Sequence, residues 1–70
     1  MEENKQAMLD ALLPALKLTR AGADITEMRY HKEDDRVNII YDDGSRDSVN
    51  VNMDSGIAMI IDVAKAVMFW

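Results

Sequence analysis

The chain has 70 residues, and its eight basic and thirteen acidic residues give a formal net charge of −5 at pH 7. A chain of this length forms a single domain, residues 1–70, near the lower size limit for a self-supporting core. The sequence contains no cysteine, which excludes disulfides and thiolate metal sites, and its negative charge disfavours binding to nucleic-acid phosphates.

The segment Glu3–Ala21 predicts the first helix. Its main apolar residues recur at the spacing of one helical face: Leu9, Leu12, Leu13 and Leu16. Gly22 follows at the place where a left-handed residue commonly ends a helix. Pro14 removes one internal hydrogen bond, but it falls on the side away from the leucines. We therefore expect one kinked helix, with two shorter helices as the alternative.

Three alternating segments predict strands over Asp24–Lys32, Arg36–Gly44 and Ser45–Met53, joined by an EDDR turn and an Asp-Asp-Gly turn. One side of each strand is apolar, and these residues are expected to point inward: Met28, Tyr30, Val37, Ile39, Tyr41, Val49, Val51 and Met53. The other side is polar, which is typical of an antiparallel sheet with one solvent-exposed face.

The last segment predicts a second helix that begins at Asp54 or Ser55, either of which can cap the first free amides. We expect the wider of its two apolar stripes to pack on the sheet: Ile57, Ile60, Ile61, Ala64, Val67 and Met68. The second stripe lies on the far side: Met59, Val63, Ala66 and Trp70. A helix that is apolar all round is central or lies at an interface. We therefore predict that the second stripe binds a protein partner or a second copy of the chain.

These elements together predict a two-layer α+β fold of order α-β-β-β-α, with an antiparallel three-stranded sheet and both helices on one face. The closing apolar run, Ile57–Trp70, is shorter than the roughly 20 residues of a membrane-spanning helix and contains Asp62 and Lys65. The acidic start, MEENKQAM, lacks the pattern of a signal peptide. We expect a cytoplasmic protein with no membrane partner.

No motif predicts catalysis. The single histidine, His31, is expected on the solvent-exposed face without an orienting partner, so we interpret it as a surface residue rather than a general base. The DSG segment before the second helix lacks the glycine pattern of a phosphate loop, and the acidic turns lack the spacing of a calcium loop. We expect no catalytic, metal or cofactor site and no enzyme activity.

Acidic residues gather in the two predicted turns: Glu33, Asp34, Asp35, Asp42 and Asp43. One interpretation is that they aid solubility and discourage pairing at strand edges. The alternative is an anionic surface that meets a basic partner, so that the protein would act as an inhibitor or a decoy mimicking nucleic acid.

Two resemblances bear on function. The element order resembles the double-stranded-RNA-binding domain, but that family has a lysine-rich start to its second helix, where this chain has MDSGIAMIID and no cation before Lys65. We therefore expect no RNA binding. The runs MRYHKEDDRVNIIYDDG and VNVNMDSGIAMIIDVAKAV resemble small uncharacterised proteins encoded on phages and other mobile elements of Firmicutes. That resemblance implies an accessory role in a bacterial cytoplasm.

Overall fold

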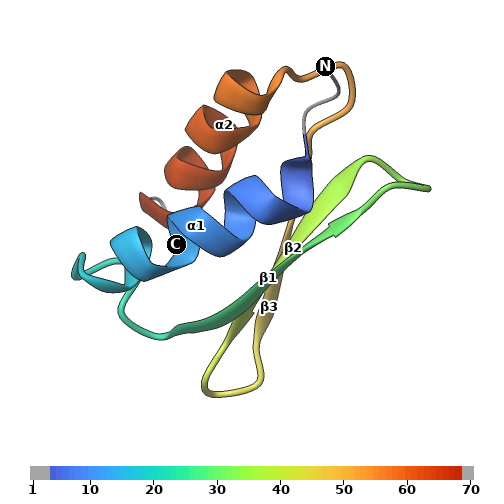
Figure 1. Cartoon of the computed structure of the whole chain (residues 1–70). Helices are drawn as coiled ribbons and strands as arrows, with labels where there is room; N and C mark the ends of the chain where they lie inside the picture. Colours follow the sequence, from blue (N-terminus) through green and yellow to red (C-terminus); the bar gives the residue numbers. More distant parts are fainter. Residues whose placement is uncertain (1–3, 69–70) are drawn as a thin grey trace.

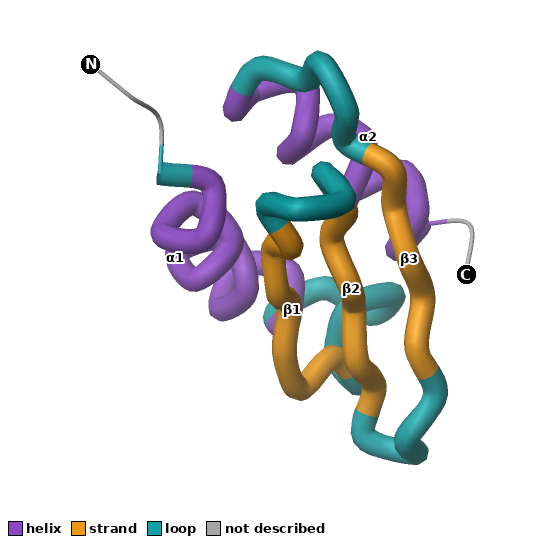
Figure 2. Tube along the Cα trace, turned by 90° about the vertical axis from the view of Figure 1, so that its right-hand side faces the viewer, coloured by secondary structure: helices purple, strands orange, loops and turns teal. Residues whose placement is uncertain are grey.

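The computed structural model of the chain describes residues 4–68. Its elements are α1 (Lys5–Lys17), β1 (Ile25–His31), β2 (Arg36–Tyr41), β3 (Arg46–Asn50) and α2 (Gly56–Met68). The strands form an antiparallel sheet in the order β1-β2-β3. Both helices lie on one face of this sheet, with α1 nearer β1 and α2 nearer β3, and the opposite face is open (Figure 1 and Figure 2). The predicted α+β fold is confirmed.

The first helix is continuous through Pro14, so the alternative of two shorter helices is wrong. Asn4 caps it, because its side-chain oxygen accepts a hydrogen bond from the amide of Ala7 at 3.0 Å. The leucine face is confirmed: Leu9 is buried, and three further leucines pack partly buried against the core, Leu12, Leu13 and Leu16. The helix begins and ends inside the predicted Glu3–Ala21 range.

α1 ends at Lys17, before the predicted Ala21, and Thr19 bonds to the chain on both sides of this end. Its hydroxyl donates to the carbonyl of Leu16 at 2.6 Å and accepts from the amide of Gly22 at 3.0 Å. Gly22 does not adopt the left-handed conformation predicted for it. It is buried, and a Cβ at this position would lie 2.4 Å from the carbonyl oxygen of Leu16. A glycine is needed here because the chain passes close to the end of α1.

A bulge in β1 changes which of its residues face the helices. Ile25 pairs with Tyr41 and Glu27 with Ile40, so one residue of β1 is extra between these two pairs. As a result Ile25 and Met28 are both buried, although their separation in sequence would place them on opposite sides of a regular strand. β2 has no such irregularity, and its predicted inward residues are all buried: Val37, Ile39 and Tyr41.

The segment after β3 departs from the prediction at Met53. Val49 is half-buried and Val51 is buried, as expected. Met53 instead lies in the turn that follows the strand, with a left-handed φ of 68°, and its side chain is 94% exposed. The strand ends at Asn50, so alternation no longer decides where Met53 points.

The second helix is rotated about its axis relative to the predicted orientation, although Val67 is buried as predicted. Met59, Val63 and Val67 are buried in the hydrophobic core, together with residues of α1 and the sheet. Ile57 and Ile61, expected in the core, are exposed. Because α2 is apolar on both sides, periodicity alone does not determine which side is buried.

The connection between β3 and α2 restrains the orientation of α2 on the sheet. The amide of Val51 donates to the carbonyl of Asp35 at 2.9 Å, which ties the end of the sheet to the turn between β1 and β2. The left-handed Met53 then redirects the chain. Ser55 caps the helix, because its hydroxyl oxygen accepts from the amide of Ala58 at 3.2 Å. With this connection, α2 packs Met59, Val63 and Val67 into the core.

Candidate interaction surface

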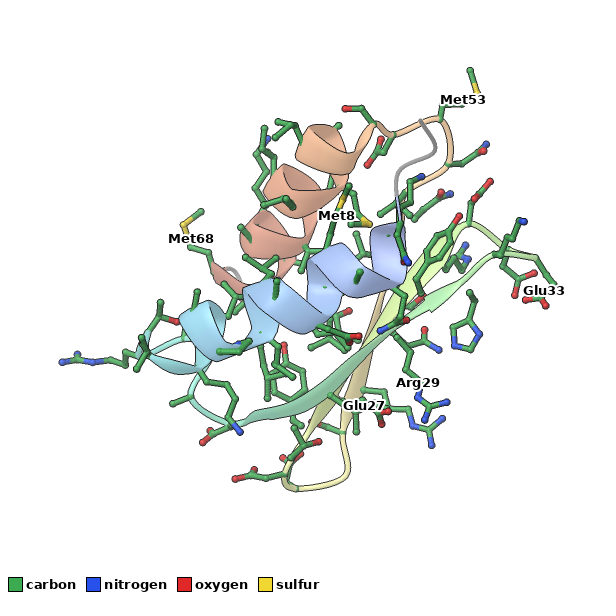
Figure 3. The ribbon with its side chains drawn as sticks, viewed as in Figure 1. Met8, Glu27, Arg29, Glu33, Met53 and Met68 are labelled. Atoms are coloured by element: carbon green, nitrogen blue, oxygen red, sulfur yellow. The ribbon has the colours of Figure 1, made fainter. Side chains whose placement is uncertain are left out.

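One side of α2 presents large apolar side chains to solvent. Ile57 is 69% exposed, Ile61 48% and Met68 60%. Ile60 and Ala64 are half-buried and lie between them on the same side of the helix. We call these residues the outer face of α2: Ile57, Ile60, Ile61, Ala64 and Met68. In Figure 3, Met68 points away from the body of the domain at the C-terminal end of α2.

The residues predicted to bind a partner do not form a surface. Met59 and Val63 have no exposed area, and Ala66 is half-buried and packs against the core. Trp70 lies outside the described residues. Met59 and Val63 are therefore core residues of the domain, because α2 is rotated as described above.

The polar residues of α2 lie beside the outer face and not on it. Lys65 is exposed, and Asp62 is half-buried next to Asp54 at the start of the helix. A hydrogen bond between the two carboxyl groups, followed by burial and charge repulsion, raises the pKa of Asp54, which the positive charge of Lys5 opposes. Lys65 borders the outer face beside Ile61 and Met68.

The five acidic turn residues do not form one surface. Glu33, Asp34 and Asp35 lie in the turn between β1 and β2, whereas Asp42 and Asp43 lie in the turn at the other end of β2 (Figure 1). A strand of six residues separates the two turns by roughly 20 Å.

Two of these acids make local bonds. The carboxylate of Asp35 accepts from the hydroxyl of Tyr30 at 2.7 Å. The carboxylate of Asp43 accepts from the amide of Ser45 at 2.8 Å, and hydrogen bonding from Ser45 lowers the pKa of Asp43. Asp35 and Asp43 thus help to hold the turns.

The free edge of β1 borders a groove. This groove encloses about 640 Å³ between α1 and β1, and its lining includes Gln6, Arg29 and His31. His31 is half-buried and pairs across the sheet with Arg36. Glu27 and Arg29 point away from the helices in Figure 3 and form an ion pair of 2.5 Å. Within residues 4–68 no group of three or more His, Cys, Asp or Glu side chains could hold a metal ion.

Sequence reasoning did not identify Gln6. Its side-chain nitrogen donates to the carbonyl of Met28 at 3.1 Å, and its side-chain oxygen accepts from the amide of Tyr30 at 2.8 Å. Gln6 thus joins α1 to the backbone of β1. A glutamine near the start of a predicted helix gives no sequence signal for such a contact.

Comparison of the chain with protein families, with curated proteins and with solved structures finds no match. The resemblances to phage-encoded proteins and to the double-stranded-RNA-binding domain therefore stay predictions. Across residues 4–68, neither helix has the length and apolar character that crossing a membrane requires.

Proposed function

We propose that this protein is a small, non-enzymatic interaction module that self-associates through the outer face of α2. One observation carries the proposal: Ile57, Ile61 and Met68 are all substantially exposed on one side of a single helix. Single exposed apolar residues are ordinary, whereas several together on one face are typical of an interaction site.

The size of the outer face favours a reversible contact. Full burial of one such side chain contributes about 1.5–3 kcal/mol, and each copy supplies Ile57, Ile61 and Met68. The gain from both copies is then on the order of 10 kcal/mol, comparable with an association cost of roughly 4–15 kcal/mol. We therefore expect a dimer that forms at high protein concentration and dissociates on dilution.

The spacing of the outer face is compatible with a second copy as partner. In an antiparallel pair with two-fold symmetry, Ile61 meets Ala64 of the second copy, and Ile57 meets Met68 of the second copy. Ala64 is the smallest residue of this face, and a small side chain near the crossing point lets two helices approach closely. The same residues thus supply both halves of a self-complementary contact.

The alternative of an acidic inhibitor or decoy has less support. Its residues divide between opposite ends of β2, and Asp35 and Asp43 accept hydrogen bonds within their own turns. A basic partner would then meet two separate acidic turns and not one continuous anionic surface.

Sedimentation velocity over a concentration series tests the proposal with two variants that make the same chemical change. Ile61→Lys places a charge on the outer face, whereas Leu18→Lys changes a side chain that is 90% exposed and lies beyond the end of α1. We expect the wild type and Leu18→Lys to dimerise alike and Ile61→Lys to stay monomeric, with unchanged circular dichroism. A wild type that is monomeric at every concentration would contradict self-association.

A further inference from the structure

The free edge of β1 is closed by a side chain from α1. Backbone groups of alternate residues in an edge strand point away from the neighbouring strand. In β1 these include the carbonyl of Met28 and the amide of Tyr30, and the carboxamide of Gln6 bonds to both. The second hydrogen of the Gln6 amide is held by the carboxylate of Asp10 at 2.9 Å. The Gln6 carboxamide is therefore held by two hydrogen bonds to β1 and one to Asp10.

A glutamine carboxamide carries the same donor and acceptor as a peptide group. Gln6 bonds to the carbonyl of Met28 and to the amide of Tyr30, two outward groups that an antiparallel neighbour would bond through two of its own residues. The side chain thus occupies the place of an additional strand. The groove of about 640 Å³ lies beside this contact, so the edge is reachable from solvent.

We propose that the free edge of β1 is a pairing surface for β1 of a second copy, and that Gln6 controls access to it. A two-fold axis at Arg29 sets Met28 opposite Tyr30 of the second copy, so that the two backbone groups now held by Gln6 bond between copies. The same register sets Glu27 opposite His31 of the second copy. The guanidinium of Arg29 is already paired with Glu27, which reduces repulsion at the axis.

Gln6 keeps this surface closed because it competes from within the same chain. The contact between copies would replace two hydrogen bonds by equivalent ones, so the bonds alone give little net gain. Gln6 also has the advantage of a high effective concentration. Removing its carboxamide leaves Met28 and Tyr30 with backbone groups to satisfy and opens the edge.

This inference does not depend on the outer face of α2. To keep the two contacts apart, every test protein carries Ile61→Lys. Arg29→Cys then places one thiol at the expected two-fold axis of a chain that has no cysteine of its own. Directly opposed residues of such a pair have Cα atoms about 4.5–5.5 Å apart, which is within the range of a disulfide.

The experiment compares the rate of disulfide dimer formation in Arg29→Cys with and without Gln6→Ala, and uses Ser48→Cys, exposed on the other edge strand, as the control. We expect Gln6→Ala to increase the rate at least tenfold for Arg29→Cys and to leave Ser48→Cys unchanged. Equal rates with and without Gln6→Ala, or an equal increase for Ser48→Cys, would overturn the proposal.

A second measurement tests the proposal even if Gln6→Ala impairs folding. Hydrogen exchange of the Tyr30 amide in the chain that carries only Ile61→Lys should be slow, as for a bonded amide, although β1 is an edge strand. Gln6→Glu keeps the acceptor for Tyr30 and loses the donor to Met28, so it should open the edge in part and give an intermediate cross-linking rate. Fast exchange at Tyr30 with Gln6 present would show that the edge is not closed.

Discussion

At the scale of single residues, Asp54 and Asp62 bring two carboxyl groups together at the start of α2. The pKa of Asp54 is raised, first by its hydrogen bond with Asp62. A raised pKa means that the folded state holds the Asp54 proton more tightly than the unfolded state does, so protonation favours folding. This contribution is fully present below the unfolded-state pKa, and it is lost as the pH rises through the folded-state pKa of Asp54.

The contribution of Asp43 to folding stability depends on pH in the opposite sense. Its pKa is lowered by hydrogen bonding from Ser45, so its contribution to stability is present above the unfolded-state pKa and is lost as the pH falls through the folded-state pKa. A stability profile of the wild type therefore combines contributions of both signs. The carboxyl group of Asp54 has to be observed on its own.

We predict that Asp62→Asn moves the pKa of Asp54 down towards its ordinary value, because the neighbouring carboxylate no longer shares a proton or repels the charge. An NMR titration of the Asp54 side-chain carbon measures this. Glu33→Gln is the matched control, since it removes one negative charge at an exposed hairpin tip and should leave Asp54 unchanged. An unaltered Asp54 pKa in Asp62→Asn would contradict the coupling.

At the scale of elements, α2 has a buried side and an outer face that are both apolar. Met59 has no exposed area, whereas Ile57, two positions earlier, is 69% exposed. The two residues thus have opposite environments on one helix, although their hydrophobicity alone predicts similar roles.

We predict that Met59→Ala lowers the free energy of unfolding by about 2–5 kcal/mol, because it leaves a cavity in the core. For the monomer, Ile57→Ala should stay within about 0.5 kcal/mol of the wild type. Urea unfolding followed by circular dichroism at a low, monomeric concentration measures both. Equal losses for the two variants would show that the assignment of faces is wrong.

The elements also show how far the sequence determines the structure. The β2 pattern predicts its buried residues correctly, because a regular central strand keeps strict alternation. β1 contains a bulge after Ile25, and no residue type near it signals the extra position. Alternation therefore predicts Met28 correctly and does not identify Ile25 as a core residue.

The pattern of α2 predicts two apolar stripes, but it does not show that Met59 and Val63 are the residues buried in the core. The amphipathic pattern of α2 has two apolar stripes, and the choice between them depends on Met53, Ser55 and the bond between Val51 and Asp35. The bond between Val51 and Asp35 joins segments that are distant in sequence, so it is not visible in a local pattern. The contact of Gln6 with β1 was missed for the same reason.

At the scale of the whole molecule, the domain measures 34 × 20 × 18 Å, and it carries the two surfaces that we propose for a second copy. The outer face of α2 is open to solvent, whereas the edge of β1 is held by Gln6. If both were open, two different two-fold contacts on each copy would carry assembly beyond a dimer. One open surface and one closed surface instead favour a discrete dimer.

A dilution series of methyl NMR spectra of the wild-type protein tests self-association most directly. It reports on the outer face and the core of α2 at the same time. Our account predicts that the methyl resonances of Ile57, Ile61 and Met68 shift with concentration, while those of Met59 and Val63 move much less. Methyl resonances that are all independent of concentration, or shifts confined to residues outside α2, would contradict it.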